Sequence, residues 1–179
     1  MTQSTGLATD AGSVQSLKSS REELIVKGEC GDCCGPGCAD SFLAEAVKDV
    51  KLVSDHFDWV GIYFLKNGVL ELGPYIGAKT EHTRIAIGTG VCGTAVAEDR
   101  DINVPDVHAV QNYLACSLET RSELVVLVRD LEGKILGQID IDSHTPGAFG
   151  AREEQAVKAV AKKLGVIWSE HVSPSKSRL

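Results

Sequence analysis

The sequence predicts an α+β domain, in which an antiparallel sheet carries an N-terminal and a C-terminal helix on one of its faces. Two β-rich runs are joined by Lys66-Asn-Gly68 and two more by Asp130-Leu-Glu-Gly133, and both connections have the composition of hairpin turns. Hairpins join antiparallel strands, and the helical periodicity lies before and after these strands. This order favours one layer of helices packed against one layer of sheet.

The first helix is expected to begin at Asp40 or Ser41, because an oxygen-bearing side chain can cap its first turn. The closing helix is expected over residues 151–171, where Glu154 and Lys158 can pair one turn apart. A short helix is expected at 91–97, and a loop that can hold a helical turn at 107–121. The expected strands are 59–65, 69–73, 83–87, 102–104, 123–129 and 134–141.

The chain of 179 residues fits one domain, and an apolar fraction of 43% is enough to fill one core. We expect an N-terminal tail at 1–38 with a weak helix and a cysteine-rich loop, the domain at 39–172, and a C-terminal tail at 173–179. No apolar run has the roughly 18 to 20 residues of a membrane span, and the first 20 residues lack the apolar segment of a secretory signal. A cytoplasmic protein is expected.

The net charge of −7 argues against a nucleic-acid partner, because polyanions are bound by clustered lysine and arginine side chains. The nearest candidate is the pair Lys162 and Lys163, which shares its helix with Glu153 and Glu154 and is interpreted as a solvated face. Structural disulfides are rare in reducing compartments. The six cysteines therefore favour buried side chains, metal ligands or redox groups.

Residues 137–143 alternate between apolar and acidic side chains near the end of the sheet. A strand places Ile139 and Ile141 on one face and Asp140 and Asp142 on the other. Two interpretations stay open. The acidic face lies in solvent, or it lines a polar pocket that can bind an ammonium group or donate a proton.

Three further residues beside this strand are candidates for chemistry. Glu123 begins the preceding strand, so the hairpin would bring it close to the two aspartates. Cys116 lies on the irregular segment before Glu123. Cys92 lies in the first turn of the short helix, where unpaired backbone N–H groups favour a thiolate. Each cysteine alone has a structural interpretation, but together with three acids they form a candidate site.

Four more cysteines lie close together before the first expected helix: Cys30, Cys33, Cys34 and Cys38. Three interpretations stay open for them, namely a zinc or other soft-metal site, an auxiliary store of thiols, and incidental loop cysteines. The adjacent pair Cys33 and Cys34 would strain a tetrahedral zinc site.

Seven short motifs follow one another over residues 57–165, and together they resemble the GAF-domain family of free methionine-(R)-sulfoxide reductases. They are Asp58-Trp-Val-Gly-Ile-Tyr63, Leu72-Gly-Pro-Tyr-Ile-Gly77, Ile87-Gly-Thr-Gly-Val-Cys-Gly-Thr-Ala95, Asp106-Val-His108, Ala115-Cys116, Ser122-Glu123 and Asp140-Ile-Asp-Ser143. The combination in this order is specific, whereas one of the motifs alone would not be.

The resemblance implies an oxidoreductase that reduces free L-methionine-(R)-sulfoxide to methionine, an antioxidant repair reaction. Cys116 would attack the sulfoxide sulfur and become a sulfenic acid, a second cysteine such as Cys92 would condense with it to a disulfide, and thioredoxin would reduce the disulfide. The resemblance implies no cofactor and no metal, and it suggests a homodimer.

The same resemblance implies how the substrate is bound. The acidic pocket residues would be Glu123, Asp140 and Asp142, which are suited to holding the substrate ammonium and to protonating the departing oxygen. Trp59 and Tyr63 match the pocket walls around the substrate methyl group.

The sequence departs from the family pattern at His82, where many members carry a third cysteine that acts as a resolving thiol. Four possibilities stay open: Cys92 resolves Cys116, an N-terminal cysteine does so, the external reductant attacks the sulfenic acid, or turnover is impaired. His82 could instead lower the pKa of Cys116 or donate a proton, although a surface histidine is the simpler interpretation.

The main alternative function is a GAF module that binds a small molecule as a sensor without catalysis. A third interpretation is a metal-binding redox scaffold centred on the N-terminal cysteines. Two cysteines beside three acids favour the enzyme, because a sensor has no need of them.

Overall fold

The computed structural model describes residues 39–110, 114 and 117–172. Cys116 and the four N-terminal cysteines lie outside the described residues, as do the tails predicted at 1–38 and 173–179. None of the helices in the described part of the chain combines the length and apolar character that a membrane crossing needs.

A six-stranded antiparallel sheet forms the centre of the structure, with strand order β3-β2-β1-β6-β5-β4. Strands β1 and β6 are therefore neighbours at its middle although they lie far apart in the chain. The β-branched and aromatic residues that predict these strands fit a pleated surface that is packed on both faces. The strands are β1 (Trp59–Lys66), β2 (Val69–Ile76), β3 (Arg84–Ala86), β4 (Ile102–Val104), β5 (Ser122–Arg129) and β6 (Ile135–Ser143).

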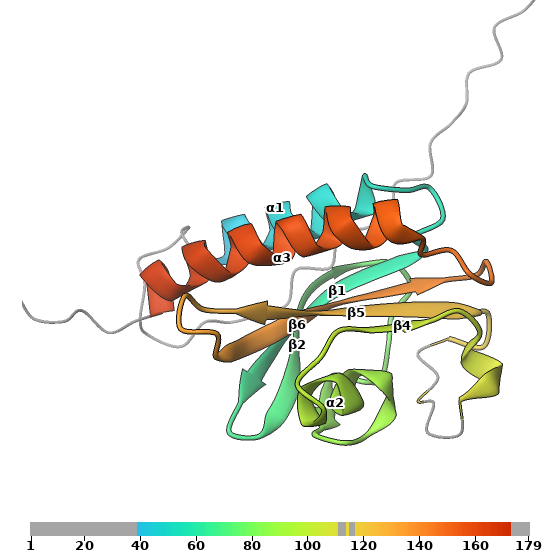
Figure 1. Cartoon of the computed structure of the whole chain (residues 1–179), viewed down its shortest axis with the longest axis horizontal. Coiled ribbons are helices and arrows are strands. Elements are labelled where there is room, and N and C mark those ends of the chain that lie inside the picture. The colour runs from blue at the N-terminus through green and yellow to red at the C-terminus, as the bar shows by residue number, and fades with distance from the viewer. Residues whose placement is uncertain (1–38, 111–113, 115–116, 173–179) are drawn as a thin grey trace, which may run out of the picture.

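Two long helices, α1 (Ala39–Lys51) and α3 (Ala151–Val172), cover one face of the sheet. Figure 1 shows them side by side, α1 in blue and α3 in red. Their apolar stripes bury Val47, Val157 and other residues in one core with inward side chains of β1, β5 and β6. The predicted pair of Glu154 and Lys158 forms, with Oε2 and Nζ 3.4 Å apart. The predicted α+β fold, with both terminal helices on one face, is confirmed.

The opposite face of the sheet is covered by the short helix α2 (Gly90–Ala97) and the 3₁₀ turn η1 (Val107–Ala109), as Figure 1 shows for α2. Helix α2 is apolar on nearly all sides, so most of its residues are buried and build a second core against the sheet. All the described candidate residues for chemistry except His82 lie on this side of the sheet.

Strand β2 continues to Ile76, three residues beyond the end that the sequence predicts at Gly73. The register pairs Gly61 with Tyr75 and Tyr63 with Leu72, so that two residues of β2 oppose one residue of β1. Such a bulge accommodates Pro74, which has no N–H to donate to a ladder. The proline therefore bends the strand and does not end it.

Two glycines allow the Trp59 ring to lie flat against the backbone of β1 and of the segment after β2. A Cβ atom at Gly61 would lie 2.2 Å from Cη2 of the indole, and one at Gly77 would lie 2.5 Å from Cδ1. Gly77 also has a φ of +138°, which disfavours other residues. The position of Trp59 thus depends on the absence of side chains at both sites.

We expect Gly61→Ala to lower the free energy of unfolding by about 1–3 kcal/mol, because the new methyl group overlaps the Trp59 ring. Urea unfolding followed by circular dichroism measures the loss. In a Trp59→Phe background the smaller ring leaves room, so the same substitution should be less destabilising there. Equal losses in both backgrounds would contradict the proposed contact.

Candidate active site

Strand β6 carries a stripe of three polar side chains on its α2 side: Gln138, Asp140 and Asp142. The alternate residues Ile139 and Ile141 point to the other face and join the core under α1 and α3, as the period of a strand predicts. Asp142 is only 2% exposed, and the other two polar residues are completely buried. The interpretation of this acidic face as a solvent face is therefore wrong.

Two other elements bring Glu123 and Cys92 to the stripe. The register of the β5–β6 hairpin places Glu123 directly opposite Asp142. Cys92 lies in the first turn of α2, and this helix can approach β3 closely because residue 93 is a glycine. A Cβ atom at Gly93 would lie 2.3 Å from the carbonyl oxygen of Ala86. The local sequence therefore fixes both the helix that carries the thiol and its distance from the sheet.

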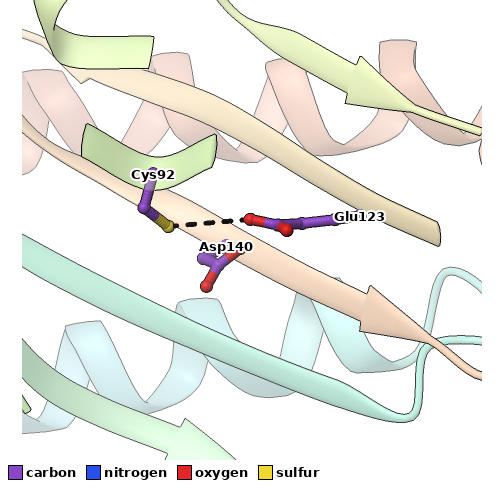
Figure 2. A group of neighbouring side chains, drawn as sticks. All are labelled: Cys92, Glu123 and Asp140. Carbon is purple, nitrogen blue, oxygen red and sulfur yellow. Dashed lines mark hydrogen bonds between the residues drawn. The ribbon is translucent and has the colours of Figure 1, made fainter. Parts of the chain in front are cut away.

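The Cys92 thiol and the carboxyl groups of Glu123 and Asp140 form one cluster. Figure 2 shows the thiol pointing toward Glu123, with the Asp140 carboxyl beside both. The thiol donates to Oε1 of Glu123 over a sulfur–oxygen distance of 3.9 Å. One potential ligand atom from each of the three residues lies within 4.8 Å of the other two. Three of the residues predicted from the sequence are thus brought together, with Asp142 next to them.

Burial raises the pKa of all three carboxyl groups, and repulsion from neighbouring carboxylates adds to the shift for Glu123 and Asp142. Burial raises the pKa of Asp140 to about 6, and the nearby Cys92 thiol and Glu123 carboxyl partly offset this shift. Burial, and then the charges of Asp140 and Asp142, raise the pKa of Glu123 well above its usual range. Burial also raises the pKa of Asp142, with the Asp140 and Asp58 charges adding to it. The three carboxyl groups therefore lose their protons at a higher pH than exposed carboxyl groups do.

The aspartates lack the partners that buried charges ordinarily have. Neither oxygen of Asp140 or Asp142 has a hydrogen-bond partner of ordinary geometry among the described residues. No lysine, arginine or histidine of the described ranges forms an ion pair with these two residues or with Glu123. The site is therefore suited to a group that brings both hydrogen-bond donors and positive charge, and an ammonium group brings both.

Trp59 and Tyr63, predicted as pocket walls, both lie in β1 on the α2 side of the sheet, and Trp59 lies directly opposite Asp142. The Trp59 ring stacks on Tyr75 with the ring centroids 5.5 Å apart. The Tyr63 hydroxyl donates to the carbonyl oxygen of His82 at 2.9 Å. His82 is partly buried and not fully exposed, and its backbone holds one of the two predicted wall residues in place.

A small hollow of about 70 Å³ opens beside the cluster. Asp142 and Trp59 line its buried side. Ser117, which follows the cysteine predicted as the nucleophile, lines it as well. At its exposed rim Nε2 of His144 lies 3.8 Å from Oε2 of Glu119. The hollow thus connects the acidic stripe with the segment after residue 116.

Sequence reasoning missed Gln138, which lies in β6 between Tyr63 of β1 and Leu127 of β5. It is completely buried, and neither atom of its amide group has a hydrogen-bond partner among the described residues. The alternation that identifies Asp140 places Gln138 on the same face, and this is the signal that could have found it. The polar stripe is therefore one residue longer than predicted.

Residues 39–168 match the GAF domain family, and the antiparallel sheet with its terminal helices is the fold of this family. The free methionine-R-sulfoxide reductase of Escherichia coli K12 is 36% identical over 127 residues, which cover 69% of this chain and 76% of that protein. These two matches define the class of the protein.

Two solved structures agree with this assignment. The type II free methionine-R-sulfoxide reductase from Thermoplasma acidophilum is 37% identical with a TM-score of 0.70, over 74% of this chain and 94% of that one. The free methionine-R-sulfoxide reductase from Neisseria meningitidis, solved in complex with its substrate, is 34% identical with a TM-score of 0.63, over 69% of this chain and 73% of that one. The chain belongs to the GAF-domain family of free methionine-R-sulfoxide reductases.

We expect Asp140→Asn to stabilise the substrate-free protein at high pH. An acid whose pKa is raised on folding destabilises the folded state progressively as the pH rises from the unfolded pKa through the folded one. For a shift from 3.8 to about 6 this loss is on the order of 3 kcal/mol above pH 7 and vanishes below pH 4. Urea unfolding at pH 4 and pH 8 should therefore show a gain at pH 8 alone. The exposed control Asp55→Asn should change neither value, and a destabilised Asp140→Asn variant at pH 8 would contradict the assignment.

Gln138→Met should raise the free energy of unfolding by about 1–2 kcal/mol, because it removes two buried polar atoms and keeps a similar shape. Thermal unfolding at one pH measures the difference, with the exposed Gln155→Met as the matched control. A loss of stability would mean that Gln138 has a hydrogen-bond partner in the folded protein, and would contradict its assignment as a buried amide without one.

Proposed function

We propose that this chain reduces free L-methionine-(R)-sulfoxide to methionine with a cysteine thiol. The observation that carries the proposal is the burial of the Cys92 thiol beside the Glu123 and Asp140 carboxyl groups, which together with the neighbouring Asp142 form no ion pair within the described residues. The family supports it, since relatives named for this activity are about one-third identical to this chain.

The acids serve to recognise the free amino acid. Glu123, Asp140 and Asp142 offer buried negative charge, and the substrate ammonium offers the positive charge and the N–H donors that these groups lack. A methionine sulfoxide within a polypeptide has no ammonium group and cannot satisfy them. Trp59 and Tyr63 supply the apolar walls for the methyl sulfoxide end.

Cys116 is the proposed nucleophile. Its thiolate attacks the sulfoxide sulfur, and the oxygen is protonated and passes to the cysteine sulfur as the sulfur–oxygen bond of the substrate breaks. The substrate sulfur gains two electrons and leaves as methionine, while Cys116 loses two and becomes a sulfenic acid. Asp140, with a pKa of about 6, is a suitable proton donor near neutral pH.

Cys92 is the proposed resolving cysteine. Its thiolate attacks the sulfenic sulfur, a disulfide forms and water leaves, after which a dithiol reductant such as thioredoxin restores both thiols. The described neighbours of Cys116 support the pairing. Leu114 packs into the α2 core, with its Cβ 2.9 Å from the place of a Cβ at Gly90, and Ser117 lines the hollow beside Asp142. His82 cannot form a disulfide, so it takes no part in this step.

A homodimer and a thioredoxin-like reductant complete the proposal. Light scattering of the purified full chain measures the first. Turnover coupled to thioredoxin and its reductase measures the second.

The direct test is consumption of free L-methionine-(R)-sulfoxide by the full chain with thioredoxin or dithiothreitol, beside a Cys116→Ser variant. Turnover should occur and should disappear in the variant. If the chain binds methionine or its sulfoxide but shows no turnover with either reductant, the proposed enzymatic activity is refuted and the GAF sensor is favoured.

Glu123→Gln should raise KM for the free sulfoxide by at least about 30-fold, because loss of one partner of a buried charge pair costs about 2–5 kcal/mol. Steady-state kinetics at pH 7.5 give the value. Glu132→Gln is the matched control, since Glu132 is exposed on the turn between β5 and β6, and its KM should not change. An unchanged KM in Glu123→Gln would exclude this carboxylate from substrate binding.

A further inference from the structure

We propose that Cys92, Glu123 and Asp140 also bind a thiophilic divalent cation of the Zn²⁺ class, and that the bound ion excludes the substrate. The sequence predicts no metal at this place. Binding follows from the arrangement of the side chains, whereas the inhibition rests on the proposed function and adds a regulator to it.

The three ligands come from three different elements and converge on one point. Cys92 is carried by α2, Glu123 by β5 and Asp140 by β6, and one ligand atom of each lies within 4.8 Å of the other two. Figure 2 shows this convergence. In the ranges that the structure describes, no other three histidine, cysteine or acidic side chains come together in this way. The donor set of one thiolate and two carboxylates suits a borderline-soft ion.

The distances are close to those that a tetrahedral ion needs. Zn²⁺ holds a thiolate sulfur at about 2.3 Å and a carboxylate oxygen at about 2.0–2.2 Å, which places the ligand atoms roughly 3.5 Å apart. The Cys92 sulfur and Oε1 of Glu123 are 3.9 Å apart. Rotation about the side-chain torsions of Glu123 and Asp140 closes the remaining gap of about 1 Å without moving the strands.

Unpartnered oxygens beside the cluster are a second observation that points to a bound cation. Both oxygens of the completely buried Asp140 lack a hydrogen-bond partner of ordinary geometry among the described residues, and so do both oxygens of Asp142. Asp142 lies opposite Glu123 in the β5–β6 ladder and lines the hollow that leads outward. Buried carboxyl oxygens without donors are satisfied by a proton, by a hydrogen-bond donor or by a cation, and a cation is the one of these that a neighbouring thiolate would also bind. Asp142 or a water molecule can supply the fourth ligand.

Binding is a proton exchange and transfers no electrons. The Cys92 S–H bond breaks, its proton leaves to solvent, and a sulfur–metal bond forms. The carboxylates that neutralise the ion no longer neutralise a substrate ammonium, so the ion and the substrate compete.

The test uses Co²⁺ as a coloured substitute for Zn²⁺. In the full chain five cysteines are replaced by serine so that Cys92 is the remaining thiol: Cys30, Cys33, Cys34, Cys38 and Cys116. Added Co²⁺ should produce sulfur-to-cobalt charge-transfer absorption, which Zn²⁺ should abolish. A further Cys92→Ala substitution should remove the absorption.

Carboxylate variants in the same background distinguish Co²⁺ binding by three ligands from Co²⁺ binding by the Cys92 thiol alone. Glu123→Gln and Asp140→Asn should each weaken Co²⁺ binding by more than about 10-fold, since even indirect supports of metal ligands are worth that much. The exposed controls Glu132→Gln and Asp55→Asn should bind as the background does. No charge-transfer absorption in the folded background, or equal binding in all four variants, would overturn the site.

A kinetic measurement tests the competition. In a chain that retains Cys92 and Cys116, Zn²⁺ should raise the apparent KM for free methionine sulfoxide at least about 10-fold and leave kcat unchanged. Inhibition that substrate cannot relieve would overturn the competition. If the parent chain shows no turnover while the Cys92-only background binds Co²⁺, the proposed function is refuted and the cation site is supported. If the parent chain turns over while that background binds no Co²⁺, the cation site is refuted and the proposed function is supported.

Discussion

Three carboxyl groups and a thiol are enclosed together on one face of the sheet, and the rest of the domain holds them there against their mutual repulsion. The β5–β6 register sets Glu123 opposite Asp142, and the same strands bury their other face under α1 and α3. Glycine at 61 and 93 lets Trp59 and α2 close over the acids. One face of the sheet thus packs in the core under α1 and α3, and the other face carries the acidic side chains. Strand β6 contributes residues to both faces.

Burial of unpartnered carboxylates lowers the stability of the folded protein, and this explains why the site selects positively charged groups. Buried carboxylates without partners destabilise the protein until a positive group arrives, so free energy stored in the empty site becomes available for binding. Protons, a substrate ammonium and a divalent cation can each neutralise the same oxygens. Which of them occupies the cluster depends on pH and on concentration, and this competition links the recognition of a free amino acid to the state of the Cys92 thiol.

The positions of the strands and the opposite faces of Ile139 and Asp140 could be predicted, because strand geometry fixes both locally. The sequence does not predict whether the acidic face is covered, since that depends on α2, which belongs to a distant part of the chain. Gln138 was missed because a glutamine in an alternating strand has the same pattern as a solvent-facing one. The continuation of β2 through Pro74 depends on a bulge that only the pairing with β1 reveals. The role of Cys116 stays a prediction, since it lies outside the described residues.

The central claim is that the buried acids bind a free ammonium group, and calorimetry with the Cys116→Ser chain tests it most directly. Free L-methionine-(R)-sulfoxide and its N-acetyl derivative differ in that charge and share the sulfoxide end. We predict binding of the free amino acid and at least about 30-fold weaker binding of the acetylated one. Equal affinities for the two would contradict the claim, because the carboxyl cluster would then contribute nothing to recognition.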